Sequence, residues 1–201
     1  QILPIAWINA PEKRCGKSTL LTLISRMSKR SLSTSNITGS ALFRSIESYK
    51  PTLCIDAIDT FINDNEGIRG VLNAGHSRDN PYIIRCVGDD NEPTAFNVYG
   101  AKAISGIGKI PDTLIDRSIS LTLERKMKNE KKGRVKEWPL EVSNTIQSKL
   151  SRWSDDNLQA VKDASPILPV SINDRAQDNW EILLKIALVL GKGWVERAYE
   201  A

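Results

Sequence analysis

One short stretch, Ala10–Ser18, constrains the fold more than any other part of the chain. It follows an apolar run from Leu3 to Ile8 that predicts a buried strand, and it precedes Thr19–Met27, which has helical periodicity. A strand, a loop that ends in Gly-Lys-Ser and a helix together form the setting of a phosphate-binding loop. Backbone N–H groups and the positive helix end hold phosphate oxygens in such loops. The alternative is an ordinary helix start that contains the same three residues.

The residue types in this loop predict contacts with a nucleoside triphosphate and Mg²⁺. The Lys17 ammonium would reach the β- and γ-phosphates, and the Ser18 hydroxyl would bind the metal. Pro11 replaces the first glycine of the pattern G-x-x-x-x-G-K-[ST], which fixes φ and removes one N–H. The residues predicted to bind the nucleotide are Pro11, Glu12, Lys13, Arg14, Cys15, Gly16, Lys17, Ser18 and Thr19.

A second motif runs from Pro51 to Asp56 and reads as a buried strand that ends in a carboxylate. Sheets of this class bind ligands at the carboxyl ends of their strands, so Asp56 is expected to hold Mg²⁺ from the side opposite Ser18. The next residue, Ala57, carries only a methyl group. Asp59 is the nearest carboxylate that could act as a base in its place, although it lies beyond the predicted strand end.

Strands and helices alternate through the rest of the first 125 residues. The predicted helix after Asn36 or Thr38 has Ala41, Leu42, Ile46 and Tyr49 as its inner face, and Asp64 or Asn65 caps the next helix, which ends at Gly75. The remaining predicted elements are a strand at Ser31–Ser35, a β-hairpin of Tyr82–Val87 and Ala95–Tyr99, a strand at Ala101–Ser105, a short helix at Pro111–Asp116 and a last strand at Ser118–Leu123.

The chain changes character after residue 125. The stretch Glu124–Trp138 is highly charged without an apolar face, which predicts a solvated linker or, alternatively, a nucleic-acid contact. The remainder is predicted to be helical, and the expected organisation is a core at 1–125, a charged linker at 126–138 and a helical lid at 139–201. The predicted helices are Leu140–Trp153, Leu158–Ala164, one from Ser171 or Asn173 to Gly191, and Trp194–Ala201.

Composition sets broader limits on the chain. With 201 residues and 40% hydrophobic content it suits one α/β domain with a small appendage. A net charge of +4 permits an acidic or nucleic-acid partner without requiring one. Cys15, Cys54 and Cys86 are scattered and lack metal-ligand spacing, which predicts reduced thiols and a cytoplasmic location. The chain opens within a strand run and lacks an initiator Met, so we expect it to be a fragment of a longer protein.

Taken together, these patterns resemble an AAA+ core with its lid: an α/β fold with a five-stranded parallel sheet, an inserted β-hairpin and a helical C-terminus. More specifically, the chain resembles a little-characterised bacterial P-loop ATPase family of phage, plasmid and genomic-island replication proteins, often found beside a Toprim primase domain. The runs that carry this resemblance are Pro11–Ser18, Pro51–Asp56, Leu72–His76, Val87–Asp90, Ile110–Ile119 and Asn173–Trp180.

The resemblance implies roles for further residues. Ser105 occupies the place of a polar sensor near the γ-phosphate, and Arg117 occupies that of an arginine finger that reaches the nucleotide of a neighbouring subunit. Arg175, at the start of a helix, matches the second sensor. For both arginines the alternative is a surface ion pair. The resemblance also implies a glutamate at position 57, so Ala57 is a departure that affects hydrolysis.

The hairpin resembles the insert that lines the central pore of MCM-like and viral helicases. Its tip is acidic, Asp89-Asp90-Asn91-Glu92, which is unfavourable for binding phosphate groups. Arg85 and Lys102 near its base are the better candidates for a DNA contact. His76, the single histidine, is expected to bond backbone at a helix end or, alternatively, to contact the γ-phosphate or a neighbouring subunit.

Three functions are compatible with these features. The first is an oligomeric Mg²⁺–ATP-dependent motor of mobile-element DNA replication, a helicase or helicase–primase component that binds DNA. The second is a slowly hydrolysing regulatory switch that binds ATP and recruits partners, which Ala57 favours. The third is a small-molecule P-loop kinase, which would need neither an arginine finger nor a pore hairpin and ranks last.

Overall fold

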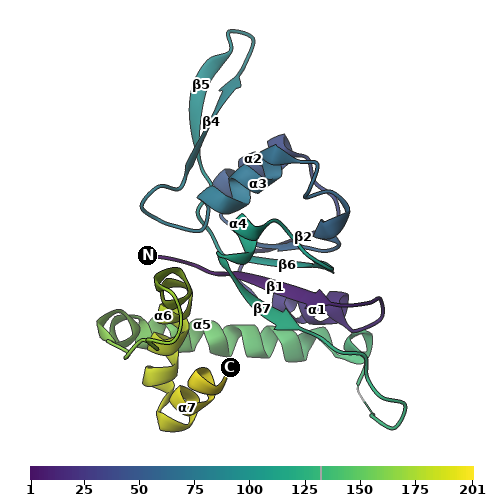
Figure 1. Cartoon of the computed structure of the whole chain (residues 1–201), viewed down its shortest axis with the longest axis vertical. Coiled ribbons are helices and arrows are strands. Elements are labelled where there is room, and N and C mark those ends of the chain that lie inside the picture. The colour runs from purple at the N-terminus through teal and green to yellow at the C-terminus, as the bar shows by residue number, and fades with distance from the viewer. Residues whose placement is uncertain (132) are drawn as a thin grey trace.

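The computed structural model describes residues 1–131 and 133–201 and has an α/β core followed by a helical C-terminal region (Figure 1). The core is built on a five-stranded parallel sheet with the order β2-β3-β6-β1-β7, which confirms the predicted sheet. Its strands are β1 (Ile5–Ala10), β2 (Ser31–Thr34), β3 (Thr52–Ile55), β6 (Lys102–Ile107) and β7 (Ser118–Thr122).

Side chains alternate between the two faces of the sheet, and each face is covered by helices. Trp7 and Ile55 pack on one face against α2 (Gly39–Tyr49), α3 (Glu66–Ala74) and α4 (Asp112–Ile115). Ile8 and Cys54 pack on the other face against α1 (Lys17–Met27). The prediction for α2 was partly wrong, because Ala41 and Tyr49 are exposed and Phe43 is buried with Leu42 and Ile46. Thr38 and Asn65 cap α2 and α3, as predicted.

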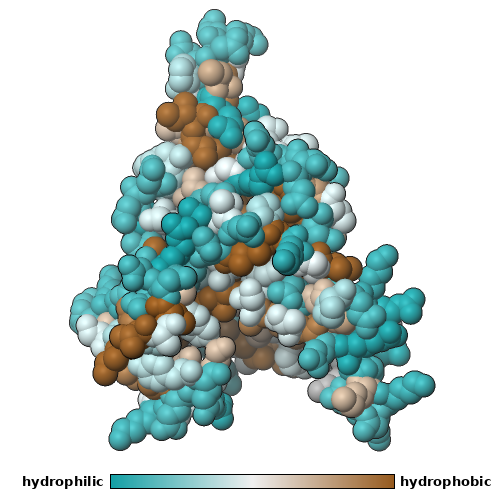
Figure 2. All heavy atoms as spheres, viewed as in Figure 1, coloured by the Kyte–Doolittle hydropathy of each residue, from teal (hydrophilic) through white to brown (hydrophobic). Residues whose placement is uncertain are grey.

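The predicted β-hairpin is present and forms a separate antiparallel pair, β4 (Tyr82–Val87) and β5 (Glu92–Asn97). It projects from the body beside α2 (Figure 1). Phe96 of β5 packs on Phe43 of α2, with 4.5 Å between ring centroids. Figure 2 shows a hydrophilic tip above a more hydrophobic base, in agreement with the exposed Asp89 and Asp90 at the turn.

The C-terminal region contains a 3₁₀ turn, η2 (Val135–Glu137), and the helices α5 (Leu140–Asp163), α6 (Asp174–Leu190) and α7 (Lys192–Glu200). The prediction of two helices within α5 was wrong. The polar stretch 154–157 contains neither Gly nor Pro, and Arg152 bonds Asp156 at 2.7 Å across one helical turn. Asn173 caps α6, as predicted, and Gly191 ends it with φ 108°. None of the described helices combines the length and apolar character needed to cross a bilayer.

Candidate functional site

The candidate site lies at the carboxyl ends of three adjacent strands, β3, β6 and β1. Ala10 ends β1 and leads through residues 11–16 into α1, which begins at Lys17. Asp56 follows β3 directly. Ser105 lies near the end of β6, the strand between β3 and β1. The parallel register places all three segments at the same edge of the sheet. Lys17, Ser18, Asp56 and Ser105 are therefore brought together, although they are distant in sequence.

The loop before α1 has the backbone features of an anion-binding turn. Arg14 and Gly16 both have positive φ, 69° and 91°, and such left-handed residues turn backbone N–H groups toward a common centre. The first N–H groups of a helix have no intrahelical partner, so the start of α1 provides donors for an anion. Lys17 Nζ donates to the carbonyl oxygen of Glu12 at 2.9 Å across the loop. A bound phosphate would compete for that ammonium.

The Asp56 carboxylate is held in a fixed orientation. Its Oδ1 accepts hydrogen bonds from the Ser105 hydroxyl and, at 3.0 Å, from the Ala57 N–H. Ser105 is completely buried, whereas Asp56 is half-buried, so the donor side of this bond is shielded from water. Asp56 and Ser18 line one cavity of about 480 Å³ together with Thr34 of β2.

This cavity suits Mg²⁺ by its donor chemistry. A carboxylate and a hydroxyl are hard oxygen ligands, and protein-bound Mg²⁺ usually takes one or two such ligands and completes its shell with phosphate oxygens and water. Within residues 1–131 and 133–201 there is no cluster of three or more His, Cys, Asp or Glu side chains that could hold a metal by itself. Ser18 and Asp56 would thus hold the ion jointly with the phosphates of a nucleotide.

Ala57 and Asp59 determine the geometry just beyond the end of β3. Ala57 adopts a left-handed conformation, φ 52° and ψ 38°, at the start of the 3₁₀ turn η1 (Ile58–Thr60). Asp59 on that turn lies against β6, because a methyl group added to Gly106 would come within 2.6 Å of its Oδ1. The same methyl group would come within 2.8 Å of the Trp7 ring. Gly106 thus makes room for the Asp59 carboxylate beside the end of β6, one residue from Ser105.

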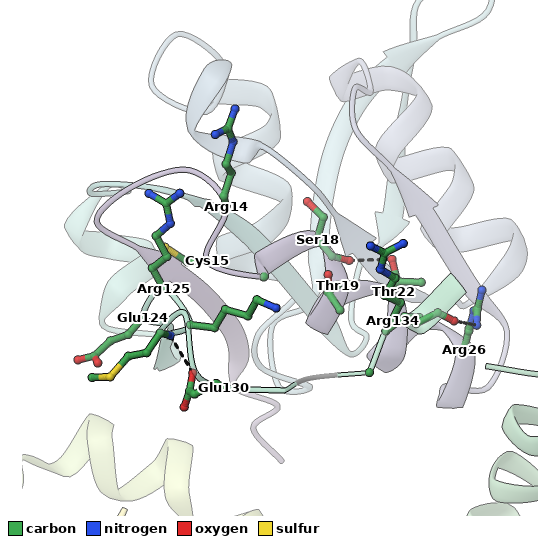
Figure 3. Close-up of a pocket in the computed structure, with 15 residues that line it drawn as sticks. Arg14, Cys15, Ser18, Thr19, Thr22, Arg26, Glu124, Arg125, Glu130 and Arg134 are labelled. Atoms are coloured by element: carbon green, nitrogen blue, oxygen red, sulfur yellow. Dashed lines mark hydrogen bonds between the residues drawn. The ribbon is translucent and has the colours of Figure 1, made fainter. Parts of the chain in front are cut away.

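A second and larger cavity, about 900 Å³, borders the other side of the loop. The charged segment, described at residues 124–131 and 133–135, lines this cavity together with α1 (Figure 3). Arg26 Nη1 donates to the carbonyl oxygen of Val135 at 3.1 Å, and Arg125 pairs with Glu12 at 3.8 Å, so both ends of this segment are attached to the core. Its charged lining side chains are Arg14, Arg26, Arg125, Lys126, Arg134, Glu124 and Glu130. Positive charge predominates, which favours an anionic ligand.

Arg117 and Arg175 lie at the opposite edge of the sheet. Arg117 directly precedes β7, whose first residue pairs with the first residue of β1. Arg117 Nη1 donates to the carbonyl oxygen of Thr113 at 2.7 Å, and Arg175 pairs with Asp116 at 3.3 Å. Partial burial lowers the pKa of Arg117, and the nearby positive charge of Arg175 lowers it further. The two arginines are neighbours, and both are separated from Lys17 by the length of β1.

His76 belongs to this second group and follows the end of α3, as predicted, but its ring bonds neither backbone nor the proposed phosphate site. Its ring is buried, 5% exposed, and Nε2 lies 2.8 Å from Asn179 Oδ1 on α6, so it contacts a side chain of its own chain instead of backbone or phosphate. Burial lowers the pKa of His76, and the charges of Arg117, Lys102 and Arg175 act in the same direction, against the raising effect of the Asn179 bond.

Lys102 was wrongly predicted as a DNA contact. Its side chain is buried at the start of β6, where Nζ donates to the carbonyl oxygens of Gly75 and Gly100, each at 2.7 Å. Burial lowers the pKa of Lys102 to about 7. Arg85 is half-buried on the hairpin, and its guanidinium bonds the adjacent carbonyl oxygen of Ile84.

Asn179, Arg26 and Arg134 were not singled out from the sequence. Asn179 is a polar residue on the apolar face of α6, and that mismatch is the one local signal that could have identified it. Arg134 lines the same cavity as Arg26 of α1 because the charged segment folds back toward that helix.

Comparison with known proteins gives one match. Residues 122–201 match a protein family whose description is "Protein of unknown function (DUF3631)". These residues include the charged segment, Arg175 and Asn179. The matched part excludes the phosphate-loop candidate, Asp56, Ser105 and Arg117. No curated protein matches the chain.

Proposed function

We propose that the chain is the ATPase part of an AAA+-like P-loop protein that binds Mg²⁺–ATP. The observation that carries this proposal is the convergence of Lys17 and Ser18 at the start of α1 with the Asp56–Ser105 pair at the ends of β3 and β6. A cation, a hydroxyl and an oriented carboxylate at one sheet edge are the parts that phosphoryl transfer uses in proteins of this class.

Each part has a definite task in the proposed site. Lys17 would exchange its bond to the Glu12 carbonyl for phosphate oxygens, and the free N–H groups of α1 would bind the same phosphates. Ser18 and Asp56 would hold Mg²⁺, which neutralises charge that develops on the transferred group. The nucleoside would then lie in the larger cavity beside residues 124–135, where Arg125 and Arg134 supply positive charge.

Hydrolysis needs groups that one copy does not bring to its own loop. β1 has six residues, so the edge that carries Arg117 lies roughly 16 Å or more from the loop at about 3.3 Å per residue. Arg117 and Arg175 would therefore act on ATP bound by a second copy, which makes the active form a homo-oligomer. In a closed ring each copy would present its arginine edge to the loop edge of the next.

The proposed biological role is a motor in mobile-element DNA replication, as a helicase or a helicase–primase component. The resemblance to replication ATPases and the projecting hairpin support this role. The acidic tip of the hairpin does not favour a direct grip on DNA phosphates.

A regulatory switch is the second candidate, and Ala57 is the observation that favours it. With a methyl group beside Asp56, the site has its binding groups but not the carboxylate that would orient and deprotonate water. Asp59 is the nearest other carboxylate, but its side chain lies against Gly106 and Trp7, on the sheet face opposite that of Ile8 and Ser105. A switch would bind ATP and hydrolyse it slowly.

The test of the shared part of both candidates is nucleotide binding. Fluorescence anisotropy with a labelled ATP analogue and Mg²⁺ should show saturable binding by the chain and none by Lys17→Ala. Lys29→Ala is the matched control, because it removes an exposed lysine just beyond the other end of α1. Equal affinity of the Lys17→Ala variant and the unmodified chain would refute the proposed site.

A further inference from the structure

Asn179 forms a buried bridge between the helical region and the corner that joins α4 to β7. Its side chain is 3% exposed, and its amide nitrogen donates to the carbonyl oxygen of Asp116 at 2.9 Å. Its amide oxygen lies 2.8 Å from Nε2 of the buried His76. Because the amide nitrogen is directed to Asp116, the amide oxygen is the acceptor and His76 Nε2 carries the proton. One side chain thus links α6, the end of α3 and the α4–β7 corner.

A second contact attaches the same helix to the same corner. Arg175 lies one turn before Asn179 on α6, so both residues are on one helical face. Arg175 pairs with the Asp116 carboxylate at 3.3 Å, while Asn179 binds the Asp116 carbonyl oxygen. The next residue along the chain is Arg117. The direction in which Arg117 leaves the corner therefore depends on how α6 holds Asp116.

Helix α6 is attached to this corner and not to the loop of its own chain. Among the described residues, the two cavities beside the loop are lined from α1, from the ends of β2 and β3 and from residues 124–135. The polar contacts of α6 with candidate functional residues thus lie at the edge that carries the two arginines.

We propose that Asn179 and His76 are positioning residues that hold Arg117 and Arg175 in the geometry needed to reach a phosphate bound by a second copy of the chain. This inference rests on the proposed function. The helical region of one copy would then influence hydrolysis of the nucleotide bound by the neighbouring copy. The physical reason is that an arginine helps transfer only when it is correctly placed, and a misplacement of about 1 Å can cost roughly 100-fold in rate.

The experiment is a mixing assay with two kinds of chain. One chain carries Lys17→Ala and supplies only arginines, and the other carries Arg117→Ala and supplies only the nucleotide site. Asn179→Ala added to the arginine-supplying chain should lower ATP turnover of the mixture by roughly tenfold or more. The same substitution added to the site-supplying chain should change turnover little, because that chain contributes no Arg117.

Two further variants separate positioning from general damage. Gln177→Ala, placed in the arginine-supplying chain, also removes side-chain bonds from α6, but those bonds go to the carbonyl oxygens of Pro169 and Ile172. It should leave turnover of the mixture unchanged. Asn179→Asp is nearly isosteric, replaces the amide donor to Asp116 with an acceptor and adds a buried carboxyl group beside His76, so it should also lower turnover of the mixture. Equal losses from Asn179→Ala in either chain, or from Gln177→Ala, would overturn the inference.

A structural readout keeps this inference distinct from the proposed function. If the mixture of Lys17→Ala and Arg117→Ala chains shows no turnover while Asn179 is intact in both, the trans role of Arg117 is wrong. Amide hydrogen exchange at residues 116–118 then tests, independently of turnover, whether Asn179 holds this corner. Exchange there should accelerate in Asn179→Ala and not in Gln177→Ala, and unchanged exchange in Asn179→Ala would show that the bridge does not hold the corner.

Discussion

The Ser105 hydroxyl, at the end of β6, donates a hydrogen bond to the Asp56 carboxylate at the end of β3. These residues are separated by 49 positions in sequence and meet because β3 and β6 are adjacent parallel strands. The bond leaves Oδ2 of Asp56 as the oxygen to face the cavity shared with Ser18, since Oδ1 already accepts two donors. Ser105 thus orients the proposed metal ligand and does not need to contact the metal.

Ser105→Ala tests this orientation. We expect a loss of about 1 kcal/mol in the free energy of unfolding from the missing hydrogen bond. The Mg²⁺ concentration needed for half-maximal binding of a labelled ATP analogue should rise roughly 10- to 100-fold, as for other groups that orient metal ligands. Ser33→Ala is the control, because Ser33 lines the same cavity and bonds Ser25 instead of Asp56. An unchanged Mg²⁺ midpoint in Ser105→Ala would contradict the prediction.

The separation of Arg117 from Lys17 predicts complementation between inactive chains. Arg117→Ala and Lys17→Ala should each lack turnover alone, because an arginine finger is worth about 10³–10⁵ in rate and the loop lysine is needed for binding. Their mixture should regain activity where an intact loop meets an intact arginine edge, and turnover should depend on protein concentration. Arg69→Ala is the control, since Arg69 also bonds a backbone carbonyl but lies on α3.

The burial of Lys102 predicts that the free energy of unfolding increases with pH above 7. Its folded-state pKa of about 7 lies below the ordinary value of 10.5, so between these values the unfolded chain binds a proton that the folded chain does not. The free energy of unfolding should therefore rise with pH across this window, by up to about 1.4 kcal/mol per unit, and lose this contribution as pH falls toward 7. Lys102→Met should flatten the dependence of Tm on pH from 7 to 10, whereas Lys109→Met, at an exposed site, should not. Parallel profiles for the Lys102→Met variant and the unmodified chain would show that Lys102 is not the group responsible.

Local patterns were sufficient for the sheet and for part of the candidate site. Apolar runs predicted the strands, and the two caps Thr38 and Asn65 follow from side chains that can accept the first helical N–H groups. The convergence of Lys17, Ser18 and Asp56 followed from one rule, that parallel strands present their carboxyl ends together. The role of these residues in nucleotide binding stays a prediction.

The contacts that sequence reasoning did not anticipate depend on tertiary docking. His76 and Asn179 are 103 positions apart, and nothing near either residue specifies the other. Likewise, the charged segment has no apolar periodicity, so its course along α1 is set by a few bonds such as that from Arg26 to Val135. Lys102 was misjudged because a buried lysine is rare, and its burial depends on the carbonyl oxygens of Gly75 and Gly100.

Ala57 leads to the last prediction, which concerns hydrolysis. The groups for binding, Lys17, Ser18 and Asp56, are present, whereas a carboxylate that activates water would act only in the transition state. Ala57→Glu should therefore raise kcat at least tenfold, within the roughly 10²–10⁴ that general-base help supplies, with little change in nucleotide affinity. The left-handed backbone at residue 57 is unfavourable for any residue with a Cβ, and alanine already bears that cost, so glutamate should fold there about as well as alanine does.

Ala57→Gln is the matched control, because glutamine has the same shape without the basic carboxylate and should leave kcat low. Single-turnover hydrolysis of radiolabelled ATP, measured beside nucleotide Kd, separates the chemical step from binding. Brisk turnover of the unmodified chain that falls sharply in Asp59→Asn would contradict this assignment. It would identify the carboxylate beside Gly106 as the base, and Asp59 would then have to turn from the sheet face of Trp7 toward that of Ser105.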